Sequence, residues 1–394
     1  MTSERVEAIV ADLKLTVYAG PHGRVYCPVS TVVEAPEGVD SAQLKTEGGK
    51  EVGCQARRVD GGLHLAWIVD DLAADAEQVY EVTFGGDGGG EGVSLDQGAE
   101  SIDVRIGGDH FTTYTFGGDI VRPRLHPLIG PHGDPVTRPM ATKGDGKDHP
   151  HHRSIWISHG CVNGWNNWAE GDGHAWTRHR EFESVESGPV YGRIVAISDW
   201  TGGDYYRGEH KSNLLVEERA GWTFYNTPGD VRIIDLTVTL TAPEIDVLFG
   251  DTKEGGLASL RVAESMEVRA GEGGMIENGN GGTNEDETWG KRAPWCHYSG
   301  PVNGKRVGIA IMDHPDSFRH PTWWHVRNYG LMTANPFGWS HFYGDESRRG
   351  NHVLEANQSL TGIYRYYIHA GNAKEGKVGE AYHDFANPPV VDVG

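Results

Sequence analysis

The sequence predicts an all-β protein with a small N-terminal β-sandwich followed by a large antiparallel two-sheet sandwich. Of its 394 residues, 56 are Gly and 19 are Pro, a composition typical of many short strands joined by tight turns. Apolar and polar residues alternate with period two along most of the chain. Strands and helices do not alternate as they do around a parallel sheet, so we expect few helical residues beyond a short stub at the N-terminus.

The first unit is expected to span residues 1–95. Strand-like runs begin at Leu15 and continue to Phe84, separated by Gly, Pro and Asp turns. The stretch from Gly85 to Ser101 is rich in Gly and acidic residues and has little to bury. We interpret it as a linker or an exposed loop that holds the domain boundary.

The second unit is expected to span residues 96–394. Period-two runs start with SIDVRIGG at Ser101, include VRIIDLTVTLTA at Val231 and end with LTGIYRYYIHAG at Gly371. Because neighbouring runs are joined by short turns, most of these strands should be antiparallel neighbours.

Charge and composition exclude several classes of partner. The chain carries 35 Lys and Arg against 56 Asp and Glu, a formal net charge of −21 that repels phosphate backbones and anionic lipids. We therefore expect neither nucleic acid nor a membrane as partner. The N-terminus is charged where a signal peptide would be apolar, and the four cysteines form no CxxC pair, so we expect a cytoplasmic protein. The formation of a homo-oligomer stays open as a further alternative.

The segment DHPHHRSIWISHG, Asp148 to Gly160, holds the densest group of reactive side chains. If its second half is a strand, Ile155 and Ile157 pack in the core with His159 on their face. Trp156 then shares the opposite face with His152. That polar face is available to a ligand, and further histidines lie in the loop that enters the strand.

Two chemistries compete for these histidines. Imidazoles bind divalent metals, so a site formed by His149, His151, His152 and His159 stays open, although the spacing matches no common zinc pattern. Neutral imidazoles also exchange protons and hydrogen bonds with a polyhydroxylated substrate. We prefer the second interpretation and expect no cofactor.

Two further segments are rich in aromatic residues. VNGWNNWAEGDGHAW, from Val162, interleaves tryptophans such as Trp165 with amides such as Asn163, a pattern that suits sugars because rings stack on C–H faces while amides bind hydroxyls. DHPDSFRHPTWWHVRNYG, from Asp313, adds Trp324, His325 and Arg327. We expect the two groups to meet over one cleft.

A carboxylate candidate lies between these segments. Glu254 sits in a Gly-flanked turn, where the backbone allows a ligand to approach closely, although a solvated acidic hairpin tip explains it equally well. The polar loop from Asn278 brings Trp289 and Lys291 and is long enough to form the rim of a cleft. The sequence lacks the GxGxxG, GxxxxGK[ST], GxSxG and HExxH motifs, which disfavours nucleotide-dependent enzymes, serine hydrolases and zincins.

Six ordered motifs between about residues 100 and 375 resemble the bacterial family labelled methane oxygenase PmoA-like. They are YTFGGDIVRPRLHPLIGPHGDPVTRPM, DHPHHRSIWISHGCVNGWNNW, DTKEGGLASLRVA, WGKRAPWCHYSG, HPTWWHVRNYGLMTANPFG and IYRYYIHAG. The resemblance implies that the large sandwich is a supersandwich similar to galactose mutarotase, encoded among bacterial genes of sugar catabolism. Its motifs match here at Asp148, His149, His151, His152, Arg153, His159, Asn163, Glu254, Arg261, Trp289, Lys291, His325 and Arg327.

We therefore expect a carbohydrate-active enzyme that cleaves a small glycoside, or an oxidised (keto) glycoside, by acid/base chemistry as a hydrolase or an eliminating lyase. A sugar mutarotase or epimerase and a non-catalytic glycan-binding or interaction protein stay open as alternatives. Glu254 or His152 would act as base and His149 or His325 as acid. Further residues would hold hydroxyls, sugar faces or developing charge: His151, Arg153, His159, Asn163, Trp165, Arg261, Trp289, Lys291, Trp324 and Arg327.

Overall fold

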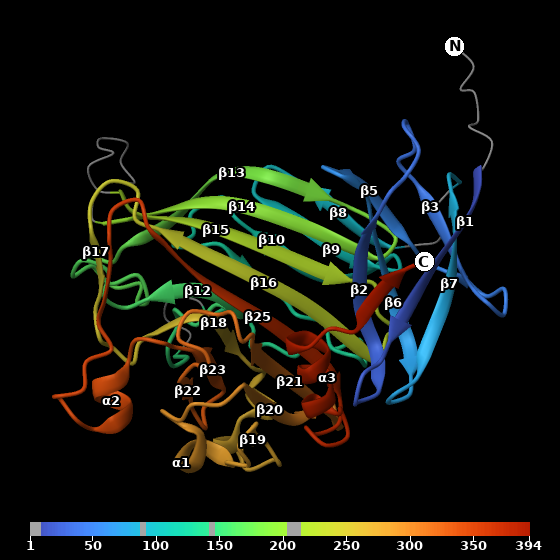
Figure 1. Cartoon of the computed structure of the whole chain (residues 1–394). Coiled ribbons are helices and arrows are strands. Elements are labelled where there is room, and N and C mark those ends of the chain that lie inside the picture. Colours follow the sequence, from blue (N-terminus) through green and yellow to red (C-terminus); the bar gives the residue numbers. More distant parts are fainter. Residues whose placement is uncertain (1–8, 87–91, 142–145, 203–213) are drawn as a thin grey trace.

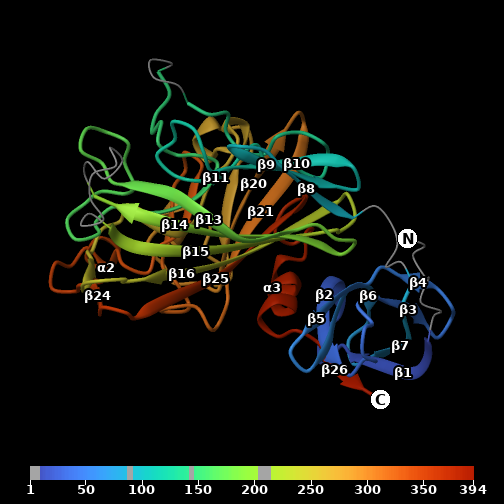
Figure 2. The ribbon, with the colours of Figure 1, turned by 90° about the horizontal axis from the view of Figure 1, so that it is seen from above.

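The computed structural model describes residues 9–86, 92–141, 146–202 and 214–394, and it confirms the all-β prediction (Figure 1). Every ladder between its strands is antiparallel in the described part of the chain. A small sandwich lies beside a large one, as expected (Figure 2).

The small sandwich combines a five-stranded sheet, ordered β26-β1-β7-β3-β4, with a three-stranded sheet, ordered β2-β6-β5. Its core is apolar and includes the fully buried Trp67. The strands are β1 (Ile9–Tyr18), β2 (Arg24–Val33), β3 (Ala42–Thr46), β4 (Glu51–Val52), β5 (Gln55–Val59), β6 (Gly62–Leu72), β7 (Glu77–Phe84) and β26 (Val390–Val393).

The large sandwich pairs two eight-stranded sheets. The sheet that we call the site sheet has the order β22-β23-β18-β12-β11-β10-β9-β8. Its strands are β8 (Val93–Gln97), β9 (Ser101–Ile106), β10 (Asp109–Thr115), β11 (Arg124–Leu125), β12 (Ile155–His159), β18 (Gly255–Arg261), β22 (Trp324–Val326) and β23 (Leu331–Ala334).

The other sheet, which we call the back sheet, has the order β13-β14-β15-β16-β25-β21-β20-β19. Its strands are β13 (Trp176–Glu186), β14 (Tyr191–Thr201), β15 (Leu214–Tyr225), β16 (Val231–Thr241), β19 (Met275–Asn278), β20 (Trp295–Val302), β21 (Lys305–Asp313) and β25 (Ser359–Ala370). A separate two-stranded sheet joins β17 (Val247–Phe249) to β24 (His352–Leu354).

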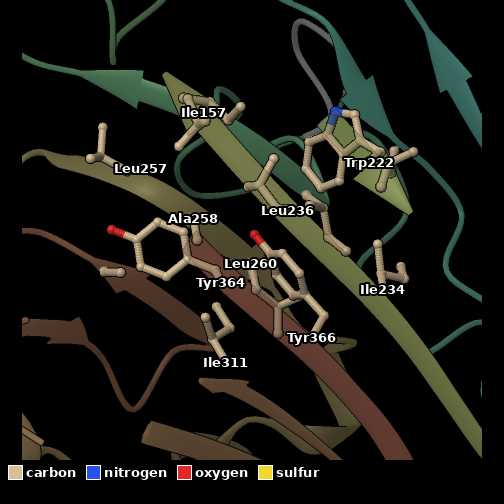
Figure 3. Packing of buried hydrophobic residues seen from close by; sticks show 14 of the residues in the cluster. Ile157, Trp222, Ile234, Leu236, Leu257, Ala258, Leu260, Ile311, Tyr364 and Tyr366 are labelled. Carbon is tan, nitrogen blue, oxygen red and sulfur yellow. The ribbon is translucent and has the colours of Figure 1, made fainter. Parts of the chain in front are cut away.

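One continuous core fills the space between the two large sheets. Figure 3 shows Ile157 and Leu260 of the site sheet packed near Leu236, Tyr364 and Tyr366 of the back sheet. The period-two alternation produces this core, since β9 buries every second residue and β16 nearly does so. The site sheet thereby keeps one face inside and presents the other to the loops that carry the histidines.

The described helices are short. They are α1 (Asn284–Thr288), α2 (Trp339–Tyr343) and α3 (Val378–Ala386), with 3₁₀ turns at Glu264–Met266 and Val268–Ala270. Helix α3, which the sequence analysis did not predict, lies between the two sandwiches (Figure 2). The expected N-terminal stub falls partly in residues 1–8, outside the described residues, and a strand begins at Ile9. No helix in the described ranges has the length and apolar character needed to cross a membrane.

The expected boundaries need correction at both ends. Within the stretch interpreted as a linker, β8 pairs with β9 and joins the site sheet, so the large sandwich begins at Val93 rather than at residue 96. At the other end, β26 pairs with β1 and extends the small sandwich. Alternation within one strand does not show which distant strand it will pair with, so sequence patterns missed this return.

Candidate functional site

The polar face of β12 forms the base of the site. Ile155 and Ile157 pack into the core between the sheets, whereas Trp156 points to the opposite face. The Trp156 indole N–H donates a hydrogen bond to Oγ of Ser158 at 2.9 Å, which fixes the ring against the strand. The alternation predicted from the sequence is confirmed here.

Three histidines cluster above this face. The ring of His152 lies 5.5 Å from Trp156, 4.8 Å from His149 and 4.7 Å from His151, measured between centroids. His149 has a φ of 43°, in the left-handed region, so the loop turns sharply enough to bring its ring back over His152. The side chain of His149 is 40% exposed while His152 is buried, so the cluster opens to solvent on its His149 side.

The second aromatic group converges on the same cluster. Tyr329 stacks on His149 with 4.7 Å between ring centroids. The ring centroid of Trp168 lies 5.4 Å from that of His152 and 6.5 Å from that of His325. Trp168 therefore lies next to two histidines that are far apart in the sequence. The expected meeting of the two segments is observed for these residues.

Other members of the second group lie elsewhere. Trp324, expected to bind substrate, is completely buried in the core, and its indole N–H donates to the carbonyl of Ala293 at 2.9 Å. Its neighbour across the sheet is Ala334 of β23, and alternation along β22 places only His325 on the cluster side. We correct the assignment of Trp324 to a role in packing.

A network of arginines surrounds Asp148. Its Oδ1 accepts from Arg138 at 2.8 Å and from Arg261 at 3.1 Å, and its Oδ2 forms an ion pair with Arg269 at 2.8 Å. Burial alone would raise the pKa of Asp148, but the hydrogen bond from Arg269 and the charge of Arg261 outweigh burial and lower it to about 2. Asp148 is therefore ionised at neutral pH. Arg261 also donates to Glu267 at 2.8 Å.

A second ionic group holds the loop that carries Trp168. Glu170 accepts from Nε of Arg153 at 3.0 Å and from Nη1 of Arg122 at 2.9 Å. The buried Arg122 also donates to the carbonyls of Asn167 and Trp168. Burial raises the pKa of Glu170, yet the hydrogen bond from Arg153 and the charge of Arg122 bring it below its usual value.

The hydrogen bonds of two imidazoles fix opposite tautomers. Arg261, which can only donate, places Nη1 3.2 Å from Nδ1 of His152, so this Nδ1 accepts and Nε2 carries the proton. Nδ1 of His325 bonds to the carbonyl of Lys253, so this Nδ1 carries the proton and Nε2 keeps a lone pair. Burial lowers the pKa of His325 to about 3 and that of His152 well below 6.5, so both rings are neutral at neutral pH.

His159 lies away from the cluster. It sits at the far end of β12, fully buried against Phe249 and Phe337, with Nε2 bonded to the carbonyl of Gly250 at 2.9 Å. Its packing separates it from the other three histidines considered as metal ligands. Within the described ranges, no group of three or more His, Cys, Asp or Glu side chains is arranged to hold a metal ion.

Glu254 is half-buried and follows Lys253, whose carbonyl accepts a hydrogen bond from His325. Its own carbonyl accepts from Gly160 at 2.7 Å, and its N–H donates to Oγ1 of Thr252 at 3.1 Å. The backbone of the turn is therefore fixed to β12. Close approach explains the glycine that follows, because a Cβ at Gly255 would lie 2.5 Å from Nδ1 of His159.

The remaining predicted residues lie near the cluster, are exposed to solvent or have structural partners. The Trp289 ring lies 6.4 Å from that of His325, Lys291 is exposed, and Arg327 forms an ion pair with Glu285 at 2.9 Å. Asn163 accepts from the backbone of Leu248 at 2.8 Å, and Trp165 is 37% exposed.

Several residues at the site were not selected from the sequence. Asp148 stood in the quoted motif, but its partners Arg138, Glu267 and Arg269 are scattered along the chain, and only folding reveals that they share one carboxylate. Glu170 lies within the Trp-rich segment, two residues after Trp168, and its place among the aromatic residues was the local signal that could have found it.

The comparison with protein families supplies one assignment. A family model described as "Family of unknown function (DUF6807)" matches residues 101–383. The chain belongs to the DUF6807 family. The match spans the whole histidine cluster of this DUF6807 member and leaves the small sandwich outside. The resemblance to a PmoA-like family has no counterpart among the comparisons.

Two further comparisons with known proteins add little. No curated protein matches this DUF6807 member. Among solved structures, the GalM/aldose epimerase homologue from C. elegans is similar, with 8% sequence identity, coverage of 72% of this chain and 97% of that chain, and a TM-score of 0.30. At that TM-score the likeness carries no argument about this chain.

Proposed function

We propose that the protein is a carbohydrate-active enzyme in which imidazoles of the cluster transfer protons. The observation that carries the proposal is the pair of opposite tautomers on two imidazoles that both lie near the ring of Trp168. His152 offers an N–H donor and His325 offers a lone pair, and both are neutral. A donor and an acceptor around one aromatic ring suit a substrate that loses a proton at one atom and receives a hydrogen bond at another.

The roles differ from those expected from the sequence. His325 is the better candidate for the base, because its Nε2 is unprotonated, whereas His152 can stabilise a developing oxyanion through Nε2–H. Arg261 is fully buried and bonded to His152, Asp148 and Glu267, so it positions groups rather than contacting a sugar. Substrate would enter from the half-exposed His149 side.

Asp148 and Glu170 are poorly suited to hydrolysis by a paired-carboxylate mechanism. Such an enzyme needs one carboxylic acid that keeps its proton near neutral pH. Asp148 and Glu170 are both held ionised by arginines, so neither supplies that acid. Elimination from a keto-glycoside fits the neutral imidazoles best. The base removes a proton next to the carbonyl, the oxyanion receives hydrogen bonds, and the C–O bond then breaks as the glycosidic oxygen takes back the proton that the base holds.

Product analysis tests the proposal. Glycosides and keto-glycosides are incubated with the protein, and products are identified by NMR. Elimination yields an unsaturated keto-sugar and a free alcohol, epimerisation yields an isomer, and hydrolysis yields two saturated products. His152→Asn keeps an acceptor for Arg261 but removes the Nε2–H donor, so it should lose at least about tenfold in turnover. Binding of sugars with no turnover by wild type would favour a glycan-binding protein.

A matched control separates this role from general damage. His314 lies against Phe385 on another part of the large sandwich, and its Nδ1 accepts from the backbone of Asp316 at 3.2 Å. His314→Asn keeps that acceptor and should leave turnover unchanged. Equal losses in the His152 and His314 variants would contradict the proposal.

A further inference from the structure

The two sandwiches meet through ordered contacts. Ala66 of β6 packs with Val190 and Tyr191 of the back sheet. Oε1 of Gln55 on β5 accepts the backbone N–H groups of Val190 at 3.2 Å and Tyr191 at 2.9 Å. Side chains on the facing surfaces of β5–β6 and β14–β15 therefore keep fixed positions relative to each other.

A cavity of about 240 Å³ lies beside this contact. The small sandwich contributes Arg57 and His64, and the back sheet contributes Arg193 with the aromatic residues Tyr191 and Tyr225. None of these residues belongs to the histidine cluster. The residues from the small sandwich lie outside the span that matches the DUF6807 family, and those from the back sheet lie inside it.

Strand register explains why these side chains converge. Arg57 stands opposite His64 across the β5–β6 ladder, so the two share one face. Arg193 is two residues beyond Tyr191, which stands opposite Tyr225, so these three share the facing surface of the back sheet. Burial lowers the pKa of His64, and the charges of Arg57 and Arg193 lower it further.

Within the described part of the chain, the two arginines of the cavity lack the ion-pair partners that other arginines of the back sheet have. Elsewhere on the back sheet, Arg180 and Arg219 form ion pairs with glutamates. Glu186 stands opposite Arg193 in register, yet among the described residues neither Arg57 nor Arg193 takes part in a hydrogen bond or an ion pair. Nδ1 of His64 is also buried and has no hydrogen-bond partner among the residues that the structure describes. Two like charges facing one cavity repel each other unless an anion lies between them.

We propose that this cavity binds a small organic anion. A carboxylate or phosphate group would lie between the guanidiniums of Arg57 and Arg193, whose planar forks match either group. The rings of Tyr191 and Tyr225 would contact the body of the ligand. The site is independent of the proposed carbohydrate chemistry, and its two arginines come from different domains.

Calorimetric titration of the full chain tests this site, with benzoate, glucuronate and inorganic phosphate as probes and glucose as the neutral control. At least one anion should bind saturably, more weakly as salt rises, while glucose does not bind there. Arg57→Gln and Arg193→Gln should each weaken binding about tenfold or more. Phosphate binding without benzoate or glucuronate binding would overturn the part of the proposal that concerns an organic anion.

Arg58→Gln is the matched control. Arg58 is the next residue on β5 and its guanidinium donates to the carbonyl of Pro36, away from the cavity. This variant should bind the anion as wild type does. Ligand-free Arg57→Gln should melt no lower than wild type, because it removes a repulsion from Arg193. The proposal is overturned if no anion binds at about 10 mM, if the cavity variants bind normally, or if Arg57→Gln melts well below wild type.

Discussion

Arg261 holds His152 through a 3.2 Å hydrogen bond from Nη1 to Nδ1, and it does so from a position with no exposure to solvent. The same guanidinium donates to Asp148 and Glu267. The orientation and tautomer of the central imidazole therefore depend on one buried cation and its two carboxylates.

Removing that cation should destabilise the fold strongly. Arg261→Gln leaves the buried Glu267 with one remaining partner, Arg269, and should lower the free energy of unfolding by about 3 kcal/mol. Arg269→Gln removes the half-exposed partner of Glu267 and should lower the free energy of unfolding by about 1 kcal/mol or less. Urea denaturation of both variants measures the difference, and equal losses would show that Arg261 has no special role.

The ion pairs of Glu170 should be required for the position of Trp168. Glu170→Gln leaves the buried Arg122 without its carboxylate partner and should lower the free energy of unfolding by about 3 kcal/mol. Glu183→Gln is the matched control, because Glu183 pairs with Arg219 at the surface and should contribute about 1 kcal/mol or less. A Glu170 variant as stable as the Glu183 variant would contradict this account.

Acid should destabilise the protein because several histidines are buried in their neutral form. Burial lowers the pKa values of His151 and His159 to about 4, whereas unfolded histidines bind protons below about pH 6.5. The unfolded state then binds more protons than the folded state between about pH 6.5 and 4. The contribution of these histidines to the free energy of unfolding should be fully present above about pH 6.5 and should fall as pH decreases toward about 4.

His159→Gln tests this pH dependence. The amide can still donate to the carbonyl of Gly250, but it cannot take up a proton in the unfolded state. The slope of unfolding free energy against pH should decrease by up to about 1.4 kcal/mol per pH unit between about pH 6 and 5. Urea midpoints at several pH values measure it, and an unchanged slope would show that His159 does not contribute.

Helix α3 and the last strand should stabilise the small sandwich. Arg24 donates to Asp384 of α3 at 3.1 Å and to the carbonyl of Asn387 at 2.7 Å, and both ion-pair partners are buried. Arg24→Met should lower the free energy of unfolding by about 3 kcal/mol, whereas removal of the exposed pair partner in Lys50→Met should have little effect. Thermal melting measures both, and similar melting temperatures would contradict this prediction.

Local patterns predicted much of this molecule. Alternation placed Ile155 and Ile157 in the core and Trp156 beside His152, because side-chain direction in a strand depends only on position. Composition predicted the all-β class. Local enrichment likewise marked both segments that meet at Trp168.

The features that the sequence did not predict depend on contacts between residues far apart in the chain. The pairing of β26 with β1 and the shared carboxylate of Asp148 join segments that no local pattern connects. Trp324 looked like a ligand-binding aromatic, but the register of β22 directs it into the core. The tautomers of His152 and His325 are fixed by Arg261 and by the carbonyl of Lys253, and those partners became visible only in the fold.

The most direct test of the central claim is solvent deuterium exchange into a keto-glycoside, followed by NMR. His325→Asn keeps a donor for the carbonyl of Lys253 but removes the Nε2 lone pair, so only the proposed base is lost. Wild type and His314→Asn should exchange the hydrogen next to the ketone, and His325→Asn should exchange it at least about a hundredfold more slowly while remaining folded. Equal exchange rates in a folded His325→Asn variant would contradict the assignment of His325 as base.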